Sequence, residues 1–159
     1  MNVMDILMYG NRTLLGTLED LSDAGRKVGG VCGVWSVKDI MAHLASYEHL
    51  LAEALNTFSN NGIGPNMADM AELGDAWNDL QVERRTDMTV AEVMAEYNEV
   101  HEQVMARAAK IPAETYRQNG KIPWYGPEYC LDDFVVYASY GHKREHSAQI
   151  SVYRDRLKI

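Results

Sequence analysis

Three histidines, His43, His142 and His146, are the most informative residues of this chain, because together they could form a metal site. His142 and His146 stand four residues apart, and such positions lie on one face of an α-helix, one turn apart. Two imidazoles so placed can bind one metal ion. A third imidazole, His43 from a facing helix, would complete a three-nitrogen site with an open coordination position. Such a site suits a metal that takes part in a reaction better than one that only stabilises a fold.

Four long helical segments are predicted by apolar residues that recur at helical spacing, and no segment is a convincing strand. The segments cover about residues 5–21, 36–56, 90–111 and 131–157. Capping boxes begin the second and third segments, formed by Ser36 with Asp39 and by Thr89 with Glu92. The three histidines therefore fall on the second and fourth segments.

Two long connections separate these segments. The first follows the second segment to about residue 87, is mostly polar, and has room for one short helix around 67–73 or 76–80. The second includes residues 116–129, rich in glycine, proline and aromatic side chains. That loop either forms one wall of a substrate entrance or is fixed by its own aromatic packing. We therefore predict an all-α fold, a single four-helix bundle domain over residues 1–159 with long crossover connections.

The face on which each histidine lies follows from helical-wheel positions at about 100° per residue. His43 falls between Ile40 and Tyr47, within the apolar stripe of its helix. His49 points away from this stripe, and we expect it to be solvated. Tyr47 could donate a hydrogen bond to a substrate, although inward tyrosines are more often packing residues.

The fourth segment carries its two histidines on an inward stripe with small or polar neighbours. His142, His146, Gln149 and Tyr153 share this stripe. A buried imidazole needs partners for its ring nitrogens, and these are either hydrogen-bonding groups of the core or a metal. Three inward histidines on two facing helices favour the metal. Gln149 and Tyr153 are further candidates for supporting the site or lining a substrate pocket.

His101 also lies on an inward stripe, one turn after Tyr97 on the third segment. It could be a fourth ligand, a proton carrier or a core histidine. Its helix offers no second ligand one turn away, which favours a role in the core or in support of the ligands.

The run from His142 to His146 also matches His-x-x-Glu-His, the inverted motif of some zinc proteases. In those enzymes the glutamate is the base, and an acidic third ligand lies well downstream. Too few residues follow His146 for that arrangement. Glu145 is better explained as a helix-surface residue, or as an acceptor of a hydrogen bond from a metal-binding side chain.

Bulk properties exclude several classes of protein. The formal net charge of −8 disfavours nucleic acid as a partner. No apolar run reaches membrane-spanning length, and the first residues lack the basic region of a signal peptide. Cys32 and Cys130 have neither metal-binding nor redox spacing, which is typical of packing thiols in a reducing cytoplasm. We therefore expect a cytoplasmic protein.

Two sequence blocks resemble the DinB-like superfamily, which includes the YfiT-like proteins assigned as metal hydrolases. The first block is residues 35–44 with Tyr47 and Glu48, and the second is residues 142–150. The resemblance implies a left-handed four-helix bundle, often dimeric, that binds zinc, nickel or another divalent ion. It places the family's metal triad on His43, His142 and His146.

Characterised relatives in that superfamily include thiol transferases that use bacillithiol or mycothiol, and a mycothiol-dependent maleylpyruvate isomerase. The isomerase has an additional C-terminal domain, which we do not expect here. The resemblance thus implies a metal-dependent thiol S-transferase or hydrolase that acts on a small molecule, with zinc or nickel as cofactor and a low-molecular-weight thiol as a possible cosubstrate. The alternative is a non-catalytic, dimeric module that binds a small or stress-related molecule. No residue beyond the metal triad is assigned to catalysis.

Overall fold

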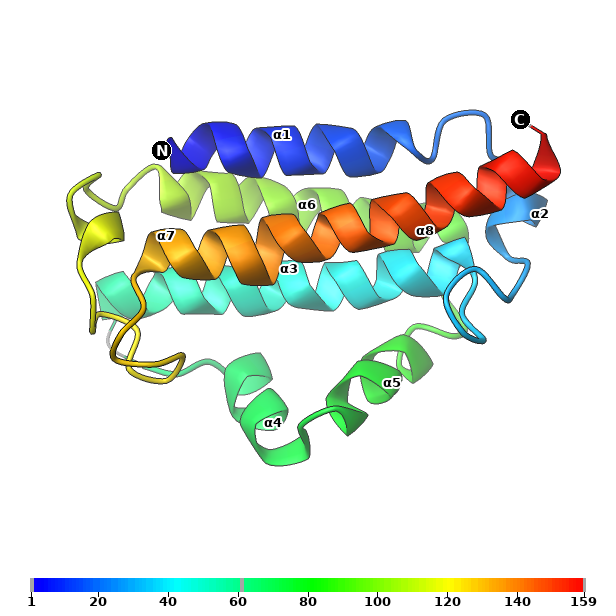
Figure 1. The fold of residues 1–159 in the computed structure, drawn as a ribbon. Coiled ribbons are helices and arrows are strands. Elements are labelled where there is room, and N and C mark those ends of the chain that lie inside the picture. The colour runs from blue at the N-terminus through cyan, green and yellow to red at the C-terminus, as the bar shows by residue number, and fades with distance from the viewer. Residues whose placement is uncertain (1, 61, 159) are drawn as a thin grey trace.

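Four long helical segments lie side by side in the computed structural model, which describes residues 2–60 and 62–158 (Figure 1). The segments are α1 (Val3–Gly16), α3 (Val37–Asn60), α6 (Val90–Ala108), and a continuous helix made of α7 (Leu131–Phe134), the π-helical η2 (Val135–Gly141) and α8 (His142–Leu157). Short helices complete the described chain: α2 (Asp23–Arg26), α4 (Pro65–Leu73), α5 (Ala76–Glu83) and the 3₁₀ turn η1 (Thr115–Arg117). Within the described residues the only β-type pairing is an isolated bridge between Cys32 and Trp35. The predicted all-α class is confirmed.

Both predicted capping boxes are present. The Asp39 carboxylate accepts hydrogen bonds from the backbone N–H and hydroxyl of Ser36, at 2.9 and 2.7 Å. Thr89 and Glu92 make the equivalent reciprocal bonds at the start of α6. These bonds pair backbone N–H groups that the first helical turn leaves without an intrahelical acceptor, so they fix where α3 and α6 begin.

The first helix is shorter than its apolar pattern indicates. α1 ends at Gly16, and the chain then turns through Asp20, whose φ of 64° is left-handed. Leu18 and Leu21 are nevertheless buried, although they lie beyond the end of the helix. Their apolar spacing therefore reflects burial and does not mark helical structure. Glycine is a poor helix former, which explains the position of the break.

The long connection between α3 and α6 forms both of the short helices that had been weighed as alternatives. α4 starts with Pro65 in its first turn, where the missing N–H is tolerated. It ends at Gly74, whose positive φ of 56° allows the chain to reverse into α5. The two helices form a V against α3 (Figure 1).

The fourth predicted helix is continuous, but residues Val135–Gly141 form a π-helix within it. A π-turn accommodates an extra residue and changes which side chains the rest of the helix presents inward. His142 is the first residue after this segment. The π-turn therefore sets the face that α8 presents to α3.

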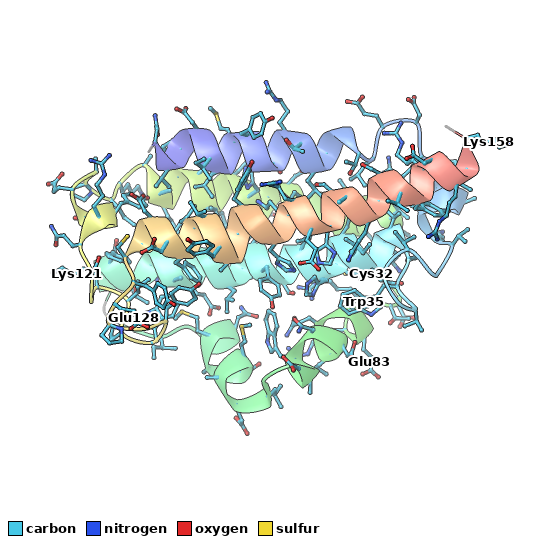
Figure 2. The ribbon with its side chains drawn as sticks, in the orientation of Figure 1. Cys32, Trp35, Glu83, Lys121, Glu128 and Lys158 are labelled. Carbon is cyan, nitrogen blue, oxygen red and sulfur yellow. The ribbon has the colours of Figure 1, made fainter. Side chains whose placement is uncertain are left out.

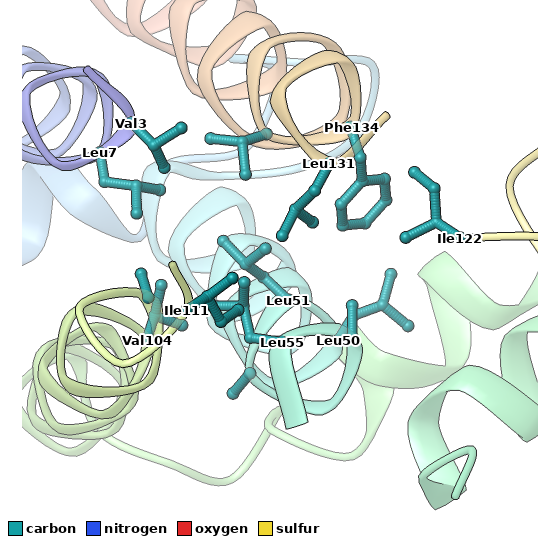
Figure 3. Close-up of a cluster of buried hydrophobic side chains, with 14 of the residues drawn as sticks. Val3, Leu7, Leu50, Leu51, Leu55, Val104, Ile111, Ile122, Leu131 and Phe134 are labelled. Carbon is teal, nitrogen blue, oxygen red and sulfur yellow. The ribbon is translucent and has the colours of Figure 1, made fainter. Parts of the chain in front are cut away.

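Apolar side chains gather into two clusters along the bundle. One cluster, near the loop that precedes α7, contains Val3, Leu7, Leu50, Leu51, Leu55, Val104, Ile111, Ile122, Leu131 and Phe134 (Figure 3). The other includes Leu14, Leu18, Ile40, Met41, Leu44, Val93, Tyr97, Ile150 and Tyr153. Among the described helices, none combines the length and the apolar character that crossing a lipid bilayer requires.

Buried polar side chains occupy the boundary between these clusters. On α3, Ser46 and Glu48 lie near the point where the apolar residues of one cluster give way to those of the other, and His43 lies among those of the second cluster. His101 on α6 and Lys143 on α8 are buried as well. Because burying polar groups is unfavourable unless they are paired, a polar layer at this depth needs an explanation in hydrogen bonds or function.

The two ends of the bundle are closed by loops (Figure 2). Cys32 and Trp35 lie at one end, in the segment that leads into α3, and Lys121 and Glu128 lie at the other. The Lys121 end is the aromatic loop, where the Tyr125 ring packs on Phe134 with centroids 5.0 Å apart. The aromatic packing that was one of the two explanations for this loop is therefore observed.

Candidate metal centre

The structure brings His43, His142 and His146 together between α3 and α8. The Nε2 atom of His142 lies 2.9 Å from that of His43 and 3.0 Å from that of His146. One nitrogen from each residue falls within 4.8 Å of the others, so the three could hold one metal ion. The facing-helix arrangement expected from the wheel positions is present.

The donor set fits a divalent cation. Two nitrogens that each lie about 2.1 Å from one ion are about 3.0–3.4 Å apart for angles between 90° and tetrahedral. The two separations from Nε2 of His142, 2.9 and 3.0 Å, lie at or just below the lower end of that range. Hydrogen bonds alone do not satisfy this cluster. The Nε2 atom of His142 has either one proton or one lone pair, yet it has an imidazole nitrogen on each side.

Burial keeps these imidazoles neutral. Desolvation, with the neighbouring imidazoles as a second cause, lowers the pKa of His43 to about 2 and that of His142 to about 4. Desolvation also lowers the pKa of His146, opposed by its hydrogen bond to Gln149. A neutral imidazole is the form that binds a metal, so the site is in its ligating state at neutral pH.

Gln149 fixes the tautomer of His146. Its Oε1 atom lies 2.8 Å from Nδ1 of His146 and accepts a hydrogen bond from it. With the proton on Nδ1, the lone pair of His146 is on Nε2, the atom that faces the other two histidines. Nδ1 of His43 is buried and has no partner among the described residues.

Aromatic rings cover the histidines on the α3 side. The Trp35 ring lies 4.9 Å from that of His43, and the Tyr47 ring lies 4.8 Å from His43 and 4.3 Å from His142. The Tyr47 hydroxyl donates to Asn78 on α5 at 3.1 Å. Burial, and secondarily the charge of Asp75, raises the pKa of Tyr47. Tyr47 is thus held as a neutral donor in van der Waals contact with two of the three imidazoles.

Comparison with known protein families covers most of the chain. The family model described as the DinB superfamily matches residues 9–150, which include all three histidines, the whole of α3, and α8 as far as Ile150. The chain belongs to the DinB superfamily. Searches of curated proteins and of solved structures gave no match.

This DinB-superfamily chain also has a buried charged cluster next to the histidines. Lys143 Nζ lies 2.6 Å from Oε1 of Glu48, and Nδ1 of His101 lies 2.8 Å from Oε2 of the same carboxylate. Burial raises the pKa of Glu48, but Lys143 and the His101 hydrogen bond outweigh it and hold that pKa below its ordinary value. His101 therefore bonds to Glu48 and does not belong to the three-histidine cluster.

The buried pairing of Glu48 with Lys143 was not predicted, although both residues lie in the two blocks that resemble the family. Each follows a residue of the site, Tyr47 on α3 and His142 on α8, so a wheel rotates it by about 100° from the inward face. Two opposite charges next to inward residues on facing helices are the only sequence signal that could have indicated the pair.

Tyr153 lies farther along α8, and its hydroxyl donates to the Gly25 carbonyl at 2.8 Å. Its ring belongs to the second apolar cluster, with Ile150. Glu145 is exposed on α8. Of the predicted supporting residues, Gln149 and Tyr47 therefore contact histidines of the triad directly.

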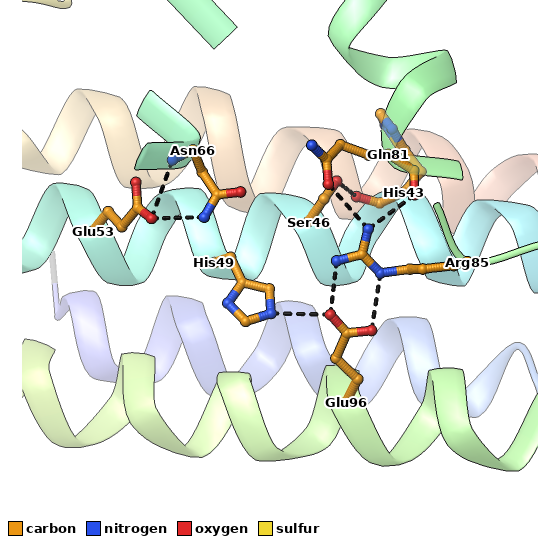
Figure 4. A network of polar contacts seen from close by, with 8 residues as sticks. All are labelled: His43, Ser46, His49, Glu53, Asn66, Gln81, Arg85 and Glu96. Atoms are coloured by element: carbon orange, nitrogen blue, oxygen red, sulfur yellow. Dashed lines mark hydrogen bonds and ion pairs between the residues drawn. The ribbon is translucent and has the colours of Figure 1, made fainter. Parts of the chain in front are cut away.

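A polar network joins Gln81 on α5, and Arg85 just after this helix, to Glu96 on α6 (Figure 4). Arg85 donates to both carboxylate oxygens of Glu96, at 2.9 and 2.7 Å, and to the backbone carbonyl and side chain of Gln81. His49 is half-exposed and contacts Glu96 at 3.0 Å, so it belongs to this network and lies away from the metal cluster. The network holds α5 so that Asn78 meets Tyr47.

Proposed function

We propose that this chain binds one divalent metal ion through His43, His142 and His146 and uses it to transform a small molecule. The observation that carries the proposal is the convergence of three neutral imidazoles, two of them buried and one half-buried, on one point. Thiol S-transfer and hydrolysis are the two reaction classes that such a site supports. Zinc and nickel are the proposed ions, since imidazole is a good ligand for both.

A divalent ion held by neutral ligands keeps its full charge. It therefore lowers the pKa of a bound thiol or water toward neutral pH. The residues of this chain supply the rest. Gln149 holds the His146 ring in the tautomer that presents Nε2 inward. Trp35 and Tyr47 pack against the imidazoles and exclude water from that side. Three protein ligands leave coordination positions for a thiol cosubstrate or a water molecule.

Metal content is the first test. Tag-free protein, stripped with chelator and titrated with Zn²⁺ or Ni²⁺, should bind one ion per chain. His142→Ala should bind neither ion at the same concentrations. His49→Ala is the matched control, because His49 lies outside the cluster, and it should bind as the unmodified chain does. Equal metal binding by His142→Ala and the unmodified chain would refute the proposal.

Turnover is the second test, and it separates the enzyme from the non-catalytic alternative. Metal-loaded protein would be incubated with electrophiles and several low-molecular-weight thiols, and separately with ester and amide substrates. Activity that is lost in His43→Ala but kept in His49→Ala supports the enzyme. Metal binding without turnover in either assay supports a module that binds a small molecule without transforming it.

We also propose that the chain acts as a homodimer in the cytoplasm. Large apolar side chains are exposed on the adjacent helices α1 and η2, including Met8, Tyr9 and Tyr137. A second copy that covers this surface would remove these side chains from water. Light scattering should give twice the chain mass, and Tyr9→Glu should shift it toward the monomer.

A further inference from the structure

An apolar cavity of about 490 Å³ opens beside the histidines. It lies between α3, α4, the aromatic loop and the start of the fourth helix. Its walls include Leu50, Met67, Met70, Trp124, Tyr125 and Phe134. None of the described residues that line it is charged. Its volume is in the range of small-molecule sites, which are usually lined by apolar and aromatic side chains.

The cavity adjoins the metal centre. A narrow crevice of about 10 Å³ is lined by His142 and shares four lining residues with the cavity: Tyr47, Leu50, Phe134 and Ala138. Tyr47 therefore belongs to the cavity wall and also packs on the His142 ring, with centroids 4.3 Å apart. A molecule in the cavity can therefore contact Tyr47, whose ring itself contacts His142.

The inner end of this space carries an unpaired polar group. Ser139 lines the crevice with His142, and its buried Oγ has no hydrogen-bond partner among the described residues. An unpaired buried hydroxyl is unfavourable, and a ligand atom that bonds to it relieves this cost. Ser139 lies within the π-helical segment, a local structure often found at functional sites.

We propose that this cavity binds the aryl or branched alkyl part of an uncharged small molecule, whose polar end points to Ser139 and His142. The uncharged walls exclude an ionic group from the cavity, because burying an unpaired charge is strongly unfavourable. The crevice at the inner end also contains Glu48 and Lys143, but their charges pair with each other at 2.6 Å. The unpaired Ser139 hydroxyl is therefore the group left to bond the polar end of an amphipathic molecule in that orientation. Binding to the cavity is independent of the proposed function, and only the reaction that follows binding rests on it.

Binding to the cavity is tested with the neutral fluorescent dye N-phenyl-1-naphthylamine on metal-free protein. Ala68, on α4, is exposed and lines the cavity, so Ala68→Trp fills the space without disturbing the core. Its matched control is Ala95→Trp, at an exposed position of α6 outside the cavity. We expect dye affinity to fall at least about tenfold in Ala68→Trp, as a loss of 1.4 kcal/mol implies, and to stay unchanged in Ala95→Trp. Equal affinity in both variants would overturn the proposal.

The orientation is tested by competition between 4-phenylbutan-1-ol and butylbenzene, which differ by one hydroxyl. The unmodified chain should prefer the alcohol several-fold, after correction for the different solubilities of the two compounds in water. Ser139→Ala should abolish that preference while leaving the affinity for butylbenzene unchanged. A preference that persists in Ser139→Ala would overturn the assignment of the polar end.

These experiments separate the cavity from the metal. His146→Ala removes a proposed metal ligand that lines neither the cavity nor the crevice, so this variant should still bind the dye. Dye binding without metal binding would refute the proposed function and leave the cavity intact. Metal binding without dye binding would refute the cavity and leave the metal centre.

Discussion

Glu48 and Lys143 form an ion pair of 2.6 Å between α3 and α8, and both side chains are almost completely buried. Each is adjacent in sequence to a residue of the metal centre. Tyr47 precedes Glu48 and contacts His142, which precedes Lys143. The charged pair and the contact between Tyr47 and His142 are therefore successive contacts of the same two helices. His101 completes the pair by bonding the second oxygen of Glu48.

Removing Lys143 should strongly destabilise the fold. In Lys143→Met, Glu48 stays buried and keeps only the His101 bond, so we expect the free energy of unfolding to fall by about 3–5 kcal/mol. Urea denaturation at pH 7 measures this change. Lys121→Met, at an exposed position of the aromatic loop, is the control and should change stability by less than about 0.5 kcal/mol. Equal effects of the two substitutions would mean that the pair contributes nothing specific.

Gln149 should control metal affinity without binding the metal. Gln149→Leu removes the acceptor for Nδ1 of His146 and releases that ring to adopt the other tautomer. We expect affinity for Zn²⁺ to fall about 10- to 100-fold, the usual cost of losing such a partner. Competition with a chromophoric chelator measures it, with Gln118→Leu at an exposed position as the control. Gln149→Glu, which keeps an acceptor oxygen, should retain most of the affinity, and failure of that rescue would argue for a packing role.

Local sequence patterns were sufficient to predict the four long helices and the starts of α3 and α6. The Ser36 and Thr89 capping boxes are formed by residues three apart, so they are visible without tertiary information. His43 and His146 lie on inward faces because their helices are regular near them and follow the wheel. To predict that the histidines converge, it was enough to know the apolar stripes of the two helices that carry them.

Features that depend on distant residues could not be predicted in this way. Burial of Lys143 requires Glu48 from another helix, and a single wheel contains no information about that partner. The π-helical residues 135–141 have ordinary apolar spacing, so periodicity gave no sign of the extra residue. Tyr153 lies on the predicted inward stripe, but its hydroxyl bonds to Gly25, which comes 128 positions earlier.

Metal loading should raise thermal stability. A ligand that binds only the folded chain stabilises it by about 2.7 kcal/mol at 100 times its Kd, which corresponds to about 5–10 °C in Tm for a chain of this size. Differential scanning fluorimetry with excess Zn²⁺ measures the shift, and chelator should reverse it. His49→Ala should show the same shift and His142→Ala none. A shift of equal size in both variants would place the bound ion elsewhere.

The carboxylate of Glu96 should make stability depend on acid pH. Burial raises its pKa, but hydrogen bonds from His49 and Arg85 outweigh burial and lower the pKa to about 2, against an ordinary value of 4.5. A group whose pKa is lower in the folded state stabilises fully above its unfolded value and loses that contribution as pH falls to its folded value. Glu96→Gln should therefore reduce the free energy of unfolding by about 1–3 kcal/mol at pH 7. That deficit should shrink steadily between pH 4.5 and 2.

Urea denaturation at pH 7, 5.5, 4 and 3 measures the deficit, with Glu99→Gln, at an exposed position of the same helix, as the control. A deficit that does not change over this range would show that packing of the Glu96 side chain matters and its charge does not.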